Sequence, residues 1–257
     1  MLWIVGVLVA IASTGCTSMT PGPLERVQAV SNQPRVGNVY LLRGWIGVFS
    51  YGINDLTTKI NRAGVRANVY QDDQWDSLGE KIRERYVSAP RHEPLVLIGH
   101  SYGADDVLRV SQRLGAAGIT VDLVVTLDPV SPPEVPANVR RCYNLYQSNA
   151  VLDKLPMFHG IPLTQAVGSH GELKNLDVRK DRTDLLEPGT NHFNIEKKGK
   201  IHDEVLKEVL ATCPPRGKWK GATRVQPFEI TPASSTQERT AAAAQKAGPV
   251  QTSRATN

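Results

Sequence analysis

Cysteine is scarce in this sequence, and patterns typical of metal sites are missing from it. Only Cys16, Cys142 and Cys213 occur in 257 residues, and their spacing is unlike that of a zinc site. No H-E-x-x-H segment is present either. The sequence therefore predicts neither a metal centre nor a cofactor.

Long apolar runs are also missing. Leu2–Ala12 is an apolar run of 11 residues, whereas a helix needs about 20 to span a bilayer. Its length is typical of a signal peptide, and the segment Ser13–Cys16 that follows resembles a bacterial lipobox. Two features depart from that pattern: no Lys or Arg precedes the run, and Ser13 replaces the usual Leu. We expect export to the periplasm or cell envelope with a membrane anchor on a lipidated Cys16; the alternative is a signal peptide cleaved near the same place.

The two remaining cysteines allow two interpretations. Exported proteins tolerate disulfides, so Cys142 and Cys213 could pair. They could equally be two separate buried thiols, because pairing cannot be deduced from sequence.

The positive charge lies almost entirely at the C-terminus. The chain has a formal net charge of +5. Residues 216–257 hold seven Lys or Arg and two Glu, which accounts for that whole excess, and residues 1–215 balance. The folded part therefore gives little reason to expect a nucleic acid as partner. The organisation that we expect is a signal peptide with lipobox (1–16), a linker (17–36), one folded domain (37–215) and a disordered basic tail (216–257).

Strand and helix patterns alternate through the predicted domain. Helices are indicated where apolar residues recur at spacings of three and four, and buried strands where short apolar runs end at glycine or proline. The predicted strands are 38–44, 65–71, 94–100, 121–129, 140–148 and 172–179. The predicted helices are 50–64, 74–87, one that follows Ser101 and reaches at least Leu114, and 201–213. This alternation predicts an α/β fold, with a mostly parallel central sheet and helices on both faces.

Ser101 lies between a predicted buried strand and a predicted helix, in the segment Gly99–Gly103, Gly-His-Ser-Tyr-Gly. A sharp strand–turn–helix connection can expose a serine as a nucleophile, and glycines on both sides permit the close packing that this turn needs. The start of the following helix offers free N–H groups to a developing oxyanion. The alternative is an ordinary turn with a passenger serine.

A serine nucleophile needs a base, and the base needs an orienting acid. His192 is the best candidate base, because it lies on a predicted loop between the last strand and the last helix; His170 is the reserve. His100 precedes Ser101 and should point away from it.

Two aspartates are candidates for the acid. Asp128 ends the fourth predicted strand, at the edge where parallel sheets place their sites. Asp153 follows the next strand and fits the topology as well, but the strand before Asp128 is the clearer signal. The oxyanion donors that we expect are the N–H groups of Tyr102 and, on the loop after the first strand, Trp45.

At these residues the chain resembles the α/β-hydrolase superfamily. Gly99–Gly103 matches its G-x-S-x-G nucleophile elbow, Leu127–Pro129 looks like the segment that carries the acid in some lipases, and Asn191–Phe193 looks like the segment that carries their histidine. The resemblance covers about residues 38–213. It implies an α/β-hydrolase fold and a Ser101, Asp128, His192 triad that acts on esters.

Two features depart from the family pattern. Arg43-Gly44 stands where His-Gly usually precedes the oxyanion loop, and the stretch between Tyr146 and Glu172 is too short for a large lid. The function that we expect is an exported serine hydrolase that cleaves carboxylic esters or thioesters, either small molecules or lipids, without a cofactor. The alternatives are an acyltransferase or peptidase with the same triad, and an inactive lipoprotein that uses the fold for binding.

Overall fold

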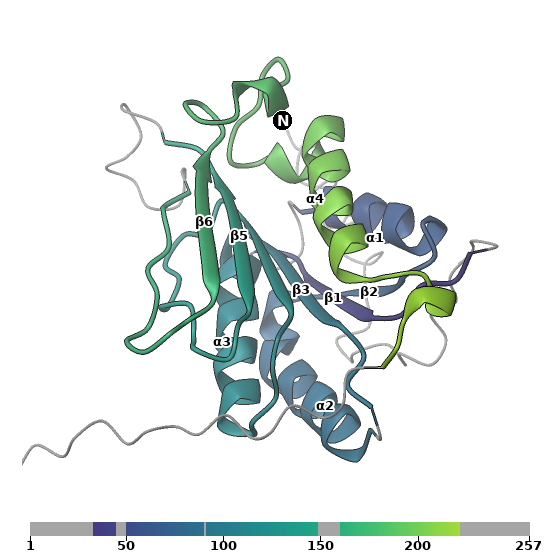
Figure 1. Ribbon diagram of the computed structural model, residues 1–257. Coiled ribbons are helices and arrows are strands. Elements are labelled where there is room, and N and C mark those ends of the chain that lie inside the picture. The colour runs from purple at the N-terminus through teal and green to yellow at the C-terminus, as the bar shows by residue number, and fades with distance from the viewer. Residues whose placement is uncertain (1–32, 45–49, 90, 149–159, 222–257) are drawn as a thin grey trace, which may run out of the picture. The chain divides into compact units, whose positions relative to one another are not determined.

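A parallel sheet forms the centre of the fold in the computed structural model, which describes residues 33–44, 50–89, 91–148 and 160–221 (Figure 1). All of these residues belong to one unit of the chain. Six strands pair in the order β2-β1-β3-β4-β5-β6, and every pairing is parallel. The strands are β1 (Asn38–Leu42), β2 (Arg66–Tyr70), β3 (Leu95–His100), β4 (Leu123–Leu127), β5 (Arg141–Tyr146) and β6 (Glu172–Asp177).

Helices cover both faces of this sheet, which confirms the predicted fold class (Figure 1). They are α1 (Gly52–Arg62), α2 (Trp75–Ser88), α3 (Tyr102–Ala116) and α4 (Gly199–Thr212). The apolar stripes of α1 and α4 pack against one face, and those of α2 and α3 pack against the other. Because β1, β3 and β4 are covered on both sides, each is buried along its whole length.

The register brings the carboxyl ends of neighbouring strands to one edge. Leu42 pairs with Gly99, and His100 pairs with Leu127. The first residue after each strand is also tied to the next strand, since the Ser101 amide donates to Leu127 O and the Asp128 amide donates to Leu145 O, both at 2.9 Å. The residues that follow β3 and β4 are therefore fixed by the sheet itself.

The two cysteines within the described ranges are free and buried. Cys142 packs in the apolar cluster on the α2 and α3 side of the sheet, and Cys213 packs in the cluster on the α1 and α4 side. Burial raises the pKa of each thiol to about 12. The sheet between them explains why they do not pair.

The described fold reaches beyond both predicted domain limits. Arg35, in the predicted linker, donates to the Leu210 and Cys213 carbonyls at the end of α4. The short helix η7 (Arg216–Lys218) lies in the predicted tail, and the backbone amide of its first residue, Arg216, donates a hydrogen bond to Pro34 O at 2.9 Å. Backbone pairing between the two ends of the domain thus extends it to both sides. In the part of the chain that the structure describes, no helix has the length and apolarity needed to cross a bilayer.

Candidate active site

Ser101 occupies a strained turn between β3 and α3. Its backbone has φ 57° and ψ −127°, a conformation that a residue with a side chain rarely adopts. Such a conformation costs on the order of 1–3 kcal/mol and persists only where the surroundings impose it. The bond from the Ser101 amide to Leu127 O holds the turn against β4. The serine side chain is thereby presented at the carboxyl edge of the sheet.

The two glycines of the motif are sterically required. A Cβ on Gly99 would come within 2.1 Å of Gly103 O, and one on Gly103 would come within 2.4 Å of Arg43 O. These contacts pack β3, α3 and the end of β1 tightly against one another. The steric reason for the G-x-S-x-G spacing is thus present in this chain.

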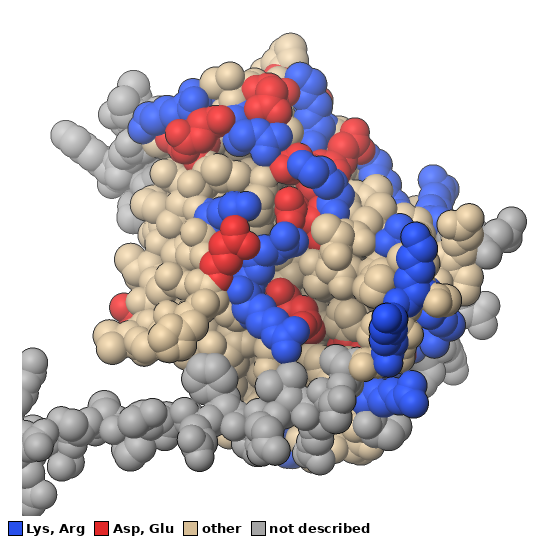
Figure 2. All heavy atoms as spheres, in the orientation of Figure 1, with Lys and Arg blue, Asp and Glu red and all other residues tan. Residues whose placement is uncertain are grey.

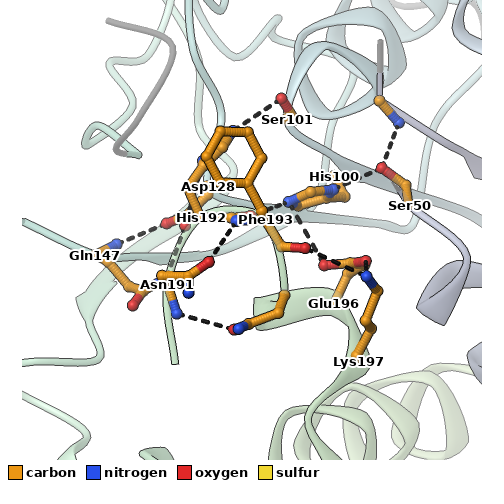
Figure 3. Close-up of polar contacts among 12 residues, drawn as sticks. Ser50, His100, Ser101, Asp128, Gln147, Asn191, His192, Phe193, Glu196 and Lys197 are labelled. Carbon is orange, nitrogen blue, oxygen red and sulfur yellow. Dashed lines mark hydrogen bonds and ion pairs between the residues drawn. The ribbon is translucent and has the colours of Figure 1, made fainter. Parts of the chain in front are cut away.

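His192 reaches Ser101 from the loop between β6 and α4. Its Nε2 lies 3.0 Å from Ser101 Oγ, and the imidazole is buried (Figure 3). Side chains within the loop set its shape: Asn191 Oδ1 accepts the Phe193 amide, and Asn194 Oδ1 accepts the Asn191 amide, both at 2.9 Å. A neutral imidazole with this geometry can take the proton of the serine hydroxyl.

Asp128 lies on the other side of the imidazole, directly after β4. It is fully buried, has φ 47°, and its Oδ2 lies 3.5 Å from His192 Nδ1. At that distance Nδ1 has no hydrogen-bond partner among the described residues. Gly160 packs so closely that a Cβ there would come within 2.4 Å of Asp128 Oδ1. Asp128 is thus held in place beside the His192 imidazole.

Gln147, the first residue after β5, holds the Asp128 carboxylate. Its amide donates to Asp128 Oδ1 at 2.7 Å, and its side-chain Nε2 donates to Oδ2 at 2.8 Å (Figure 3). The side chain of Arg179 donates to Gln147 Oε1 at 3.0 Å and to Thr190 O at 3.1 Å. Arg179 therefore links the support of the carboxylate to the loop that carries His192.

His100 forms a second buried link to the same loop. Its Nε2 lies 2.8 Å from His192 O, and its Nδ1 lies 2.8 Å from Ser50 Oγ. A carbonyl only accepts, so Nε2 carries the proton and Nδ1 accepts from Ser50. Burial, followed by the nearby His192, lowers the pKa of His100 to about 3, and the ring stays neutral.

Ser50 connects His100 to the start of the predicted oxyanion loop. Its Oγ accepts the Gly44 amide at 3.0 Å. Gly44 itself lies so close to Ser101 that a Cβ there would come within 2.7 Å of Ser101 Cβ. A directed chain of hydrogen bonds therefore runs from the end of β1, through His100, to the histidine loop.

Glu196 is a buried carboxylate just below this network (Figure 3). Neither of its oxygens has a hydrogen-bond partner within the described ranges. Lys197 Nζ lies 3.8 Å from one oxygen, and His100 Nε2 lies 3.9 Å from the other. Burial raises the pKa of Glu196 to about 7, which places its titration near neutral pH.

The structure describes only one of the two predicted oxyanion donors. Tyr102 is the first residue of α3, where a helix leaves its N–H groups without intrahelical acceptors. Trp45 falls outside the described residues, as do the alternative acid Asp153 and the predicted lipidation site Cys16. His170, the reserve base, is exposed and precedes β6, so it lies at the opposite edge of the sheet from Ser101. Within the ranges described, no group of His, Cys, Asp or Glu could hold a metal ion.

Reasoning from sequence missed the supporting residues Gln147, Arg179 and Ser50. A signal for Gln147 was available, because it directly follows β5, just as Asp128 directly follows β4. Ser50 and Arg179 carry no comparable signal, since their partners are distant in sequence.

Comparison with known proteins gives structural neighbours of low similarity. No family model matches the chain, and no curated protein matches its sequence. A proposed hydrolase of the α/β superfamily from Xanthomonas campestris pv. campestris is 13% identical with a TM-score of 0.37, over 67% of this chain and 99% of that one. Est1E from Butyrivibrio proteoclasticus is 11% identical with a TM-score of 0.42, over 70% of this chain and 90% of that one. A metagenomic carboxyl esterase is 15% identical with a TM-score of 0.36, over 69% and 74% of the two chains.

Proposed function

We propose that this chain is a serine hydrolase that cleaves carboxylic esters or thioesters through an acyl-enzyme. One observation carries the proposal: Ser101 lies in a strained strand–helix turn, 3.0 Å from His192 Nε2, with Asp128 on the far side of the same imidazole. This is the arrangement in which a general base removes the proton of a serine hydroxyl while a carboxylate orients the base.

The reaction begins when His192 Nε2 takes the proton from Ser101 Oγ. The oxygen attacks the carbonyl carbon, and the Tyr102 amide at the start of α3 stabilises the oxyanion together with a donor from the loop after β1. His192 then protonates the leaving alcohol or thiol as the tetrahedral intermediate collapses. Water, deprotonated by the same imidazole, attacks the acyl-enzyme, and its proton returns to Ser101 when the acid leaves.

Asp128 stabilises the imidazolium that forms in each half of this reaction. Its 3.5 Å separation from His192 Nδ1 has to shorten when substrate binds, as hydrogen bonds in unliganded active sites commonly do. The bonds from Gln147 leave Oδ2 fixed on the histidine side.

An apolar side chain beside the site favours substrates with an apolar part. Phe193 is 42% exposed and packs edge-on against His192, with ring centroids 5.4 Å apart (Figure 3). A substrate that approaches Ser101 can bury area against this ring. We expect Phe193→Ala to raise KM for longer acyl chains more than for acetate esters.

A fluorophosphonate probe tests the proposal directly. Wild-type protein should form a covalent adduct on Ser101, located by mass spectrometry of the peptide, and Ser101→Ala should form none. Activity on p-nitrophenyl esters should fall by about 10⁴-fold in Asp128→Asn. Asp153→Asn is the matched control and should retain activity. Absence of an adduct on folded wild-type protein refutes the enzyme; loss of activity in Asp153→Asn alone refutes the choice of acid.

We also propose that the chain is exported and anchored by a lipid on Cys16. The support is the apolar run followed by the lipobox-like Ser13–Cys16. Expression in a bacterium with labelled palmitate should label the wild type, and Cys16→Ala should remove the label and release the protein from the membrane fraction. Palmitate labelling that persists in Cys16→Ala would refute this site.

A further inference from the structure

A cleft lies at the edge of the sheet opposite the candidate active site. Its volume is about 290 Å³, and its lining comes from the start of β1, the end of α2, the segment before β3 and the segment after η7. The lining residues are Asn38, Arg85, Tyr86, Ala89, Arg91, Glu93 and Trp219. Glu93 precedes β3 and Ser101 follows it, so the length of β3, roughly 20 Å at about 3.3 Å per residue, separates the two sites.

The walls of the cleft combine aromatic rings with a satisfied polar floor. Tyr86 and Trp219 supply the rings. The Tyr86 hydroxyl accepts from Asn38 Nδ2 at 2.9 Å, so the polar atoms at its base already have partners. Trp219 is partly exposed and follows η7 directly. The rings of the cleft suit the apolar part of a ligand, and the arginines in its lining suit an anionic part.

Basic side chains surround this cleft with few opposing carboxylates. Arg66 forms an ion pair with Glu93, and its Nε is buried without a partner. Burial lowers the pKa of Arg66, and the positive charges of Arg85 and Arg216 lower it further. A neighbouring carboxylate, Asp122, is already paired with Arg140 and His92, in both cases at 3.1 Å.

Three more cations complete what we call the basic face. Arg91 lies against Gly221, and Lys218 and Lys220 flank Trp219 and are exposed. Figure 2 shows Lys and Arg side chains gathered on the right of the view, where Figure 1 draws η7. The basic face thus consists of Arg66, Arg85, Arg91, Arg216, Lys218 and Lys220 around Trp219.

Both flanking segments of the chain begin beside the basic face. The Arg216 amide bonds to Pro34 O, and Arg35 pairs with Pro215 in an antiparallel bridge. The described part of the chain therefore starts and ends at the edge that carries the cleft. Residues 222–257 add four Lys or Arg and two Glu to the chain that leaves there.

We propose that the basic face docks on an anionic phospholipid bilayer, with its cations on lipid phosphates and Trp219 at headgroup level. Aromatic side chains are favoured at that depth, and clustered cations bind the negative surface of such membranes. The proposal does not depend on the hydrolase activity. In this orientation Ser101 lies on the side of the domain away from the bilayer, at a distance of about one strand length from the basic face.

Vesicle binding tests this orientation on chains that keep the whole core. Both apolar clusters consist of residues between Val36 and Cys213. Residues 17–257 and 17–221 therefore retain the fold without the apolar N-terminal run. Both chains should co-sediment with phosphatidylcholine vesicles that contain phosphatidylglycerol, not with phosphatidylcholine alone, and high salt should release them.

Neutralising selected cations then identifies which part of the protein contacts the vesicle. Each cation near an anionic membrane strengthens binding roughly fivefold, so the triple variant Arg85→Gln, Arg91→Gln, Arg216→Gln should bind about a hundredfold more weakly. The matched control Lys174→Gln, Lys180→Gln, Lys200→Gln removes the same charge from exposed positions elsewhere and should bind like the wild type. Circular dichroism checks that both variants are folded.

Trp219→Phe provides a second readout. Brominated lipids should quench tryptophan fluorescence in the bound wild type, and the variant should lose most of that quenching. Binding that requires residues 222–257, an equal loss in both triple variants, or quenching unchanged in Trp219→Phe would overturn the proposal. Binding to soluble polyglutamate as tight as to vesicles would assign the face to an acidic polymer instead, and would overturn it as well.

Discussion

Replacing Glu196 by glutamine should stabilise the protein above neutral pH and have little effect in mild acid. The carboxyl group is fully buried below the His100 network, and neither oxygen has a hydrogen-bond partner in the described part of the chain. Glutamine has nearly the same shape as protonated glutamate and never carries the charge. The substitution therefore isolates the cost of burying that charge.

The magnitude follows from the pKa of Glu196, which burial raises from 4.5 to about 7. Between these values the folded protein binds the proton more tightly than the unfolded chain, so the free energy of unfolding falls as pH rises. At about 1.4 kcal/mol per pKa unit, the loss amounts to about 3 kcal/mol and is complete above pH 7. Below pH 4.5 both states are protonated and the loss vanishes.

Urea unfolding of wild type and Glu196→Gln across this pH range measures the effect. The difference in free energy of unfolding should grow from near zero in mild acid to about 3 kcal/mol in favour of the variant in mild alkali. Taking the difference cancels every other titrating group. Glu172→Gln, a half-exposed carboxylate on β6, is the control and should stay within about 0.5 kcal/mol of the wild type at each pH.

Two outcomes would refute this reasoning. A variant that is less stable than wild type at alkaline pH would mean that the charge is stabilised, for instance by Lys197 at 3.8 Å. A difference that does not change with pH would mean that Glu196 does not titrate in this range.

Three further predictions concern the site. Gly103→Ala should lower the free energy of unfolding by about 1–3 kcal/mol in urea titration, because its Cβ would clash with Arg43 O. A stable Gly103→Ala protein would contradict the packing of the turn. His100→Asn should lower kcat on p-nitrophenyl acetate about tenfold, since it leaves His192 O without its donor, whereas the longer His100→Gln can still reach that carbonyl and should lose less. Equal losses would argue against a positioning role. Gln147→Leu removes a hydrogen bond to a charged group, worth about 1.5–3 kcal/mol, and should reduce kcat/KM at least tenfold while a fluorophosphonate probe can still reach Ser101. An unchanged kcat/KM would show that the backbone amide alone holds the carboxylate.

The fold could be predicted largely because each element carries its own periodic pattern. Ile53, Leu56 and Ile60 indicated a helix with one apolar face, and all three are fully buried in α1. The apolar run before His100 indicated a strand covered on both sides, and β3 is buried throughout. The order of the strands in the sheet could not be predicted in this way, because strand pairing depends on contacts between distant segments that the local pattern does not encode.

The candidate site could be predicted where a residue's place in the chain defines its place in the fold. Asp128 ends a clear strand, and His192 lies between the last strand and the last helix, so both were expected at the edge that carries Ser101. The role of His100 was missed for the opposite reason. Its bond to the carbonyl of His192 joins residues 92 positions apart, and the pattern around β3 does not encode such a contact.

Composition alone set the predicted domain limits, and the structure adds backbone bonds outside them. Pro, Lys and Arg after Cys213 suggested a polar tail, yet Arg216 and Pro34 bond to each other through their backbones. Such backbone pairing does not depend on the side chains that composition counts.

The bonds that fix the first residue after β3 and after β4 have a consequence for changing this protein by design. Ser101 and Asp128 are each positioned by a bond from their own amide to the neighbouring strand, and Gly160 packs against the Asp128 carboxylate. A loop exchange after β4 or β5 therefore has to keep Gly160, whereas residues 132–134 can be lengthened or exchanged while Ser101 and Asp128 keep their spacing. Under the proposed function, exchange at 132–134 offers a way to alter which substrates are accepted without rebuilding the chemistry.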